Sequence, residues 1–452
     1  MQIITVLLAV VGSFLALSVR PVYGLIVYII SFLGYPYGAG LLSIGTIDFS
    51  VSRIIIIALF ARVILTPELT KNFKVMWLDR LVVILFAAEI AAGLVTSEAA
   101  RIIEYRGGDF CDMALPYFVV RLVVRRKEDY ITLLKAIAWG AAALSLVAFY
   151  ECLTGQNLLK LGRPLPIPEI RLKVFHRAQV TFRHAIYFGV FTGMAGAACL
   201  GLVKNVGSKA WLYMLLVGLI FLGAFSSMSS GGQFALIGAV SFVVLYRFRH
   251  SWRGLIVTAV VLCVMVEIIS NRHFYNVIDR VAFNSATAWY RTRLFEVAFF
   301  EGGMTDHWLT GYGTADPGWG PKIDFRSYTD MVNHYLLELS RYGLVGFIPF
   351  CLVIITALRN LFRGFWSLRD EDTWLIWCLG GGLFSVLLAF NSVSLFEQPM
   401  ILLFMMFGFC ATVPPLLAKK QQCVVARMES ALVHTTPDLL HGSIPSRPEA
   451  AR

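Results

Sequence analysis

Apolar segments of about the thickness of a lipid bilayer alternate with polar loops along most of the chain. A transmembrane helix needs roughly 17–25 mostly apolar residues. The candidate segments are 2–18, 21–34, 46–65, 78–97, 109–123, 130–151, 184–203, 209–226, 231–247, 253–270, 331–358, 373–392 and 397–417. Segment 109–123 is short and contains Pro116, so it is either a span or an interfacial or re-entrant piece. The pattern predicts an all-α polytopic membrane protein with 12 or 13 transmembrane helices, depending on whether the first two segments cross separately.

Two long polar interruptions divide this hydrophobic pattern, and the chain ends in a polar, proline-containing tail. We expect the tail to be cytoplasmic and disordered. The predicted organisation is N-terminal membrane helices over 1–151, a basic loop over 152–183, central membrane helices over 184–270, a large, partly helical loop over 271–330, C-terminal membrane helices over 331–417, and the tail over 418–452.

The charges of the loops predict which end of the helices faces the cytoplasm. Basic residues gather in every second loop, as expected of cytoplasmic loops. They are Lys71, Lys74 and Arg80, then Arg125 to Lys127, Lys204 and Lys209, Arg247, Arg249 and Arg253, Arg359, Arg363 and Arg369, and Lys419 and Lys420. The intervening loops 226–232 and 391–394 carry no basic residue, and acids balance the two arginines of a predicted loop at 98–109. The alternation places the loops 152–183 and 271–330 outside the cytoplasm.

Composition agrees with a membrane protein: 58% of the 452 residues are hydrophobic and only 15% are charged, against about 25% in a soluble domain. The net charge of +11 suits anionic membrane lipids, and no basic soluble domain exists to bind nucleic acid. The N-terminus lacks a basic region and a cleavage site, which predicts a retained first span. Glu89 and Arg53 lie within predicted spans, where an ionisable residue indicates either a functional site or an intramembrane pair.

Candidate chemistry lies in the two predicted extracytoplasmic loops. The loop 152–183 has six basic residues and one acid, which suits either an anionic ligand such as a lipid diphosphate or lipid headgroups. The stretch 271–343 contains Arg291, Arg293 and His334 among many aromatic residues. These aromatics are suited to stacking on sugars, but an interfacial belt explains them equally well. The arginines are also typical of headgroup anchors, and a lone histidine at a membrane boundary is more often structural than catalytic.

Four short motifs resemble the O-antigen ligase and O-antigen or exopolysaccharide polymerase superfamily of bacteria. They are Arg177-Ala-Gln-Val-Thr-Phe182-Arg-His184, Arg291-Thr-Arg293-Leu294-Phe295, Leu309-Thr-Gly311-Tyr-Gly313, and Asn333-His334-Tyr335-Leu336 leading to Tyr342-Gly343-Leu344-Val345-Gly346. The resemblance covers about residues 175–350. The chain departs from the family pattern at Val332, where the family usually has histidine, and at Ser229–Gly232, where an arginine is missing.

The resemblance implies a GT-C-like glycosyltransferase in the bacterial inner membrane with a periplasmic active-site loop. Its donor would be a glycan on undecaprenyl diphosphate, and its acceptor a second glycan or a lipid core. It would need neither metal nor cofactor, and other polysaccharide assembly proteins are candidate partners. His334 would be the general base and Arg291 would stabilise the leaving diphosphate. Substrate-binding candidates are Arg293, Arg177, Arg183, His184, Asn333 and Tyr335.

Three alternatives remain open on the sequence. Polymerase and ligase share these motifs, and we favour the polymerase. A lipid-linked glycan transporter is the main rival, although transporters usually have repeated halves and ionisable groups near the membrane centre, and we find no convincing internal repeat. A non-catalytic assembly subunit is the third alternative.

Overall fold

The computed structural model describes residues 2–36, 38–44, 47–71, 73–159, 170–171, 174–269 and 285–435. Two antiparallel hairpins accompany the helices in this described part, β1 (Leu42–Ile44) with β2 (Ile47–Phe49), and β3 (Ile170–Arg171) with β4 (Phe175–His176). The helices are α1 (Gln2–Ser18), α2 (Pro21–Gly34), α3 (Val51–Leu65), α4 (Pro67–Thr70), α5 (Trp77–Thr96), α6 (Ala99–Asp109), η1 (Phe110–Ala114), α7 (Leu115–Val123), α8 (Lys127–Thr154), α9 (Ala185–Leu200), η2 (Val203–Asn205), η3 (Gly207–Lys209), α10 (Ala210–Ser226), α11 (Ser230–Val244), η4 (Leu245–Ser251), α12 (Trp252–Ile269), α14 (Ser285–Phe299), α15 (Gly320–Ile323), α16 (His334–Ser367), α17 (Asp370–Ala389) and α18 (Gln398–Thr435).

The prediction of an all-helical polytopic membrane protein is confirmed. Seven helical segments of the described chain are long and apolar enough to cross a bilayer, and they lie in the regions of α8, α9, α10, α11, α16, α17 and α18. Helices α1 and α2 are apolar but shorter. Each segment in the predicted set contains a described helix. Many large apolar side chains of α1, α5, α10 and α12 are exposed, as expected for surfaces that face lipid.

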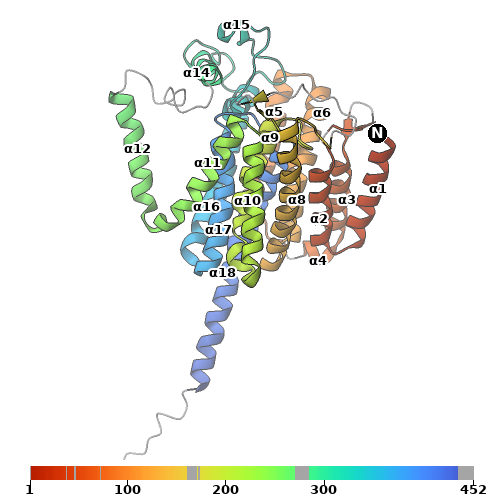
Figure 1. Ribbon diagram of the computed structural model, residues 1–452, viewed down its shortest axis with the longest axis vertical. Helices are drawn as coiled ribbons and strands as arrows, with labels where there is room; N and C mark the ends of the chain where they lie inside the picture. Colours follow the sequence, from red (N-terminus) through yellow and green to blue (C-terminus); the bar gives the residue numbers. More distant parts are fainter. Residues whose placement is uncertain are drawn as a thin grey trace, which may run out of the picture.

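The long helices stand side by side in an upright bundle (Figure 1). We call the end where α5 stops at Thr96 and α16 begins at His334 the upper end of the bundle. Helices α6, α14 and α15 lie at this end, whereas α12 stands apart at the side and α18 extends below the bundle (Figure 1). The elements that carry the candidate chemistry therefore gather at one end.

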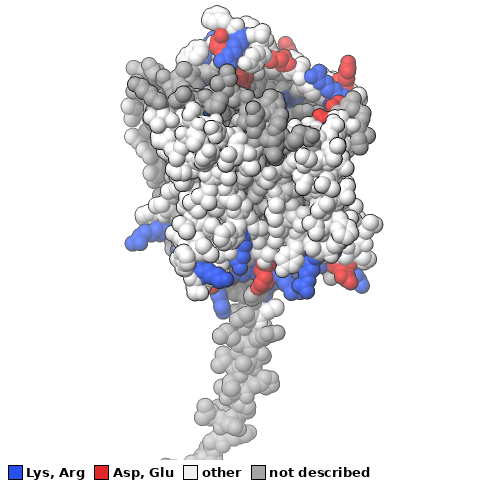
Figure 2. Space-filling view, turned by 45° about the vertical axis from the view of Figure 1, so that its right-hand side comes forward, with Lys and Arg blue, Asp and Glu red and all other residues white. Residues whose placement is uncertain are grey.

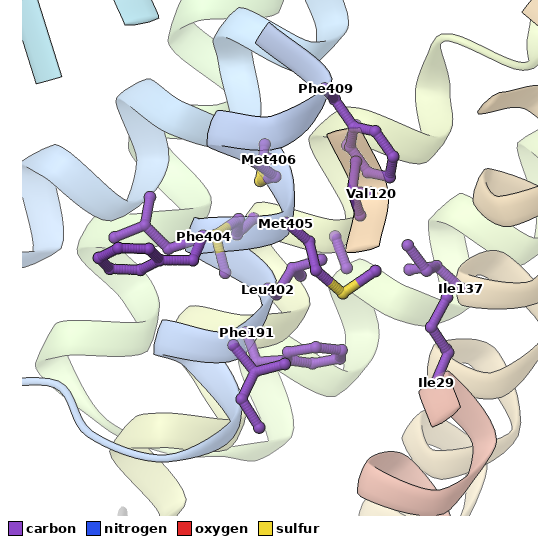
Figure 3. Close-up of a cluster of buried hydrophobic side chains, with 14 of the residues drawn as sticks. Ile29, Val120, Ile137, Phe191, Leu402, Phe404, Met405, Met406 and Phe409 are labelled. Atoms are coloured by element: carbon purple, nitrogen blue, oxygen red, sulfur yellow. The ribbon is translucent and has the colours of Figure 1, made fainter. Parts of the chain in front are cut away.

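Helices α9 and α18 form the centre of the bundle. Both are almost completely buried over their apolar stretches. Gly189 and Gly193 of α9 lie against Gly232 and Ala235 of α11, where an added Cβ atom would come within 3.0 Å of the neighbouring helix. Small residues of this kind let membrane helices pack closely. Figure 3 shows the apolar cluster that joins these central helices to α2, α7 and α8, including Phe191, Phe404 and Phe409.

Helix α16 is broken at Gly343, whose φ of 56° and ψ of −159° are not helical. The segment 308–313 packs into the break. The N–H groups of Tyr312 and Gly313 donate to the carbonyls of Ser340 and Arg341, at 2.7 and 2.9 Å. Leu344 N–H donates to the carbonyl of Trp308. The backbone groups freed by the break are therefore hydrogen-bonded to segment 308–313, as buried backbone groups must be. The break also makes residues 334–342 a separate short helix at the upper end.

Two predictions about local structure are wrong. Residues 98–109 were expected to be a loop, but they form α6, which continues through the π-helix η1 into α7 without interruption. The alternation of acids and arginines in this stretch hid an amphipathic helix. The polar tail was expected to be disordered, yet α18 continues to Thr435. Residues 436–452 lie outside the described part.

Candidate active site

A small cavity of about 20 Å³ lies inside the upper end of the bundle, between α5, α6, α16 and α18. We call it the buried cavity. Its walls combine apolar side chains with a cluster of ionisable and polar groups, namely Glu89, Tyr105, Arg106, Asp109, His334, Glu338 and Arg341. Ionisable residues are costly inside a membrane protein and usually mark a functional site. The cavity is therefore the first candidate for chemistry in the described chain.

Three of the polar residues come from one face of the short helix 334–342. His334, Glu338 and Arg341 are spaced i, i+4 and i+7, which places them on the same side of an α-helix. Asn333 is the N-cap of this helix, and its side chain accepts a hydrogen bond from Leu336 N–H at 3.0 Å. The local sequence thus starts the helix at His334 and turns all three side chains toward the cavity.

The contacts of His334 decide which of its nitrogens carries the proton. Its side chain is only 2% exposed, and its ring is stacked on Phe390 with the ring centres 4.2 Å apart. Leu395 N–H donates to Nδ1 at 3.3 Å. In a neutral imidazole the other nitrogen then holds the proton, so Nε2–H points into the cavity as a donor. No hydrogen-bond partner of Nε2 lies among the described residues.

This geometry changes the expected role of His334. A histidine whose Nδ1 is already an acceptor and whose Nε2 is protonated has no lone pair to take a proton. The nearest group that can take one is Glu338, whose Oε1 is 3.8 Å from Nε2. Glu338 is also buried, and its Oε2 has no hydrogen-bond partner among the described residues. Of the two residues, Glu338 is thus the one that can accept a proton, and His334 the one that can donate a hydrogen bond through Nε2.

Arg106 supplies the positive charge that the buried acids need. Its Nη1 donates to Glu89 Oε2 at 2.6 Å and lies 3.2 Å from Asp109, and its guanidinium lies over the ring of Tyr342. Glu338 of the short helix 334–342 lines the same cavity as Glu89 and Arg106. Glu89, to which the sequence assigned no role, thus forms a buried ion pair with Arg106 of α6.

Replacing Arg106 with glutamine should destabilise the protein by about 3–5 kcal/mol, because the buried carboxylates lose their counter-charge. Thermal unfolding in detergent measures this effect. The double variant Arg106→Gln with Glu89→Gln should recover much of the loss, since it also removes a buried negative charge. An Arg106→Gln protein as stable as the wild type would show that the pair contributes nothing.

Two open grooves meet above the buried cavity. The first, which we call the α6 groove, has a volume of about 390 Å³ and is lined by Asp48, Arg53, Glu104, Tyr105, Gly108, Asp109, Asp112, Met113, Arg183, Phe396 and Glu397. The second, the α16 groove, has a volume of about 300 Å³ and is lined by Thr314, Ala315, Asp316, Pro317, Thr329, Asp330, Met331, Leu337, Ser340, Arg341 and Phe396. Phe396 borders both grooves and the cavity. The arrangement offers two polar approaches to one buried centre.

The loop 390–397 between α17 and α18 holds several predicted site residues together. Arg291 donates through Nε and Nη2 to the carbonyl of Ser392, at 3.2 and 3.0 Å. Asn333 Nδ2 donates to the carbonyl of Asn391 at 3.5 Å, and His334 N–H to that of Phe390 at 2.8 Å. Tyr335 O–H donates to Leu387 O at 3.0 Å, just before this loop. The structure brings Arg291, Asn333, His334 and Tyr335 together. The side chains of Arg291, Asn333 and Tyr335 donate hydrogen bonds to backbone carbonyls in or beside this loop.

The remaining predicted residues lie farther from the buried cavity. Arg293 pairs with Glu296 at 3.2 Å and with Glu301. Arg183 is 69% exposed on the rim of the α6 groove, 3.5 Å from Glu397. His184 is the N-cap residue of α9 and packs on Tyr187. Arg177 is half-buried, and neither Arg177 nor His184 lines the cavity or the two grooves.

Arg291→Gln should impair function more than Arg293→Gln. The first change removes two N–H donors from the 390–397 loop, with an expected loss of roughly tenfold in activity. The second breaks half-exposed ion pairs, which contribute about 0–1 kcal/mol. Parallel activity measurements on both variants test this order. Equal losses would mean that Arg293 also acts in the site.

The most informative residues of the site were not singled out from the sequence. Glu338 and Arg341 carry a recognisable signal, because they follow His334 at i+4 and i+7 after a helix N-cap. Arg106, Tyr105 and Phe396 carry none, because the first two come from a stretch read as a loop and the third from a loop without basic residues. The contact between Tyr105 and Arg341 joins residues 236 positions apart in sequence.

Comparison of the chain with known family models and with curated proteins finds no match. The resemblance noted above thus rests on its short motifs. The basis for a functional assignment is the geometry of the buried cavity and its two grooves.

Proposed function

We propose that the protein is a membrane glycosyltransferase of the O-antigen ligase and polymerase type. It transfers or polymerises glycan units carried on undecaprenyl diphosphate, at the periplasmic face of the bacterial inner membrane. The observation that carries this proposal is the convergence of two open polar grooves on one buried cavity that holds Glu338 and His334. A transferase needs such a junction, because donor and acceptor must meet beside a group that takes a proton.

The distribution of charge supports the proposed orientation. In Figure 2 the middle of the visible face is largely free of charged residues, Lys and Arg gather at its lower end, and residues of both signs lie at its upper end. Basic residues mark the cytoplasmic side, so the upper end with the cavity faces outward. In this orientation the chain has 12 or 13 spans in a GT-C-like arrangement, with its catalytic groups at the outer end. In the described part, seven helices have the length and hydropathy expected of a span.

The proposed reaction is a single displacement. The acceptor hydroxyl oxygen bonds to the anomeric carbon of the donor sugar, and the bond from that carbon to the diphosphate oxygen breaks. The lipid diphosphate leaves with the electron pair. Glu338 takes the hydroxyl proton, while Nε2–H of His334 orients the acceptor beside it. General-base help of this kind typically contributes about 10²–10⁴-fold.

A transporter of lipid-linked glycan is the second candidate, because one observation favours it. Buried ionisable groups and a helix broken within the bundle are typical of proton-coupled transporters, and Glu89, Glu338 and the break at Gly343 fit that description. The buried cavity is bordered by the two grooves at the upper end. Access from the outer end favours the transferase.

Incubating purified protein with a defined undecaprenyl-diphosphate-linked oligosaccharide tests the proposal. A ladder of products indicates a polymerase, and a single added unit, with a lipid-core acceptor present, indicates a ligase. Movement of the substrate across reconstituted vesicles without new glycosidic bonds would establish the transporter instead. Glu338→Gln serves as the matched inactive control.

A further inference from the structure

We propose that Arg341, rather than Arg291 or Arg293, binds the diphosphate of the donor. This inference rests on the proposed function and names the group that recognises the leaving portion of its substrate. Arg341 lines both the buried cavity and the α16 groove. It is therefore the cation at the point where the α16 groove meets the cavity.

Other arginines near the site are already bound to partners. Arg106 pairs with Glu89 and Asp109, Arg53 with Asp112 at 2.6 Å, and Arg293 with Glu296 and Glu301. Arg291 donates to a backbone carbonyl. By contrast, no carboxylate forms an ion pair with Arg341 among the residues that the structure describes. Asp109 and Glu338 interact with its charge electrostatically, but neither forms a direct ion pair with the guanidinium. An anion that enters the α16 groove can therefore contact Arg341 directly.

Neutral aromatic groups fix the position of Arg341 without cancelling its charge. Its Nη1 donates to the hydroxyl of Tyr105. The guanidinium carbon lies 5.3 Å from the centre of the Tyr105 ring and 5.6 Å from that of Phe396. Cation–π contacts of this length are attractive, and burial raises the pKa of Tyr105, so its hydroxyl stays protonated. An oriented guanidinium with its charge intact is the group that best grips phosphate oxygens.

The spacing along helix 334–342 suits a displacement reaction. Seven residues of α-helix separate His334 from Arg341, a rise of about 10.5 Å. The reacting groups need a similar length. It is roughly 10 Å for a hydrogen bond to the acceptor, the forming bond, the breaking bond and a hydrogen bond to the diphosphate, placed in a row. One helix face can therefore hold the acceptor hydroxyl at its start and the leaving diphosphate at its end.

Binding of farnesyl diphosphate and farnesyl monophosphate to the purified protein in detergent tests the inference. The wild type should bind the diphosphate more tightly than the monophosphate. Arg341→Gln should weaken diphosphate binding by about 10–100-fold, the value expected for charge-assisted hydrogen bonds, and should remove the preference. Arg341→Lys, which keeps the charge but not the planar fork, should lie between the two. Tyr105→Phe should have a smaller effect, since the charge and the ring remain.

The control is Arg249→Gln, which changes an arginine paired with Asp370 that lines neither groove nor the buried cavity. Unchanged diphosphate binding in Arg341→Gln, or a wild type without preference for the diphosphate, would overturn the inference. Either result leaves the proposed function standing if the wild type still transfers glycan from undecaprenyl diphosphate. Absence of transfer by the wild type would instead overturn the proposed function. Unfolding temperatures of all variants exclude loss of fold as the cause.

Discussion

Glu338→Gln is expected to abolish glycosyl transfer while leaving the protein folded. The amide has nearly the same shape as the carboxylate but cannot take a proton at neutral pH, so the rate should fall by about 10²–10⁴-fold. Stability should be little changed, because the amide has the same shape as the carboxylate and the cluster loses a buried negative charge. The measurement is the initial rate of product formation from a lipid-linked oligosaccharide, with thermal unfolding as the check on folding.

His334→Gln separates the two assignments of the base. If His334 only orients the acceptor, its loss should cost about tenfold, the equivalent of one hydrogen bond. A Glu338→Gln enzyme with wild-type activity, together with an inactive His334→Gln enzyme, would return the role of base to the histidine. The bond from Leu395 N–H to Nδ1 would then have to open during the reaction.

Gly343→Ala is expected to destabilise the protein by about 3 kcal/mol or more, because it combines backbone strain with a steric clash. Gly343 has a positive φ of 56°, and an added Cβ atom would lie 2.3 Å from the backbone of Leu309. The segment 308–313 could then no longer enter the break in α16. The unfolding temperature and the amount of protein recovered from membranes measure the effect.

Gly364→Ala is the matched control for Gly343→Ala. It lies in the same helix, and its added Cβ atom would come no closer than 3.4 Å to any atom in the described chain, which is an ordinary van der Waals contact. The substitution should therefore be neutral or slightly stabilising, since alanine favours helix more than glycine does. Similar losses in both variants would mean that the break at Gly343 has no special importance.

The residues that carry the family resemblance shape the site more than they supply its chemistry. Gly311 and Gly343 allow a close contact between segment 308–313 and α16, where an added Cβ would approach backbone atoms within 2.6 Å. Asn333 caps the helix, and Arg291 anchors the 390–397 loop. A sequence motif can therefore be recognisable because it maintains a particular backbone path.

The sequence by itself determined the class of the protein and the limits of most helices. Long apolar segments can satisfy their backbone hydrogen bonds in a membrane only as helices, and they appear as such, from α1 at Gln2–Ser18 to α17 at Asp370–Ala389. The predicted span 331–358 also begins within three residues of the start of α16, where the structure shows Asn333 as the N-cap. Periodicity and capping depend on near neighbours, so a single sequence contains them.

Only the tertiary structure decided which residues form the site. Arg106 lies over the ring of Tyr342, and Arg341 donates to Tyr105, across segments that are far apart along the chain. The hydrogen bond from Leu395 to His334, which assigns the proton on the histidine, depends on the packing of the 390–397 loop. Charge balance, burial and proton position depend on such three-dimensional contacts, because each is set by what surrounds a group and not by its own identity.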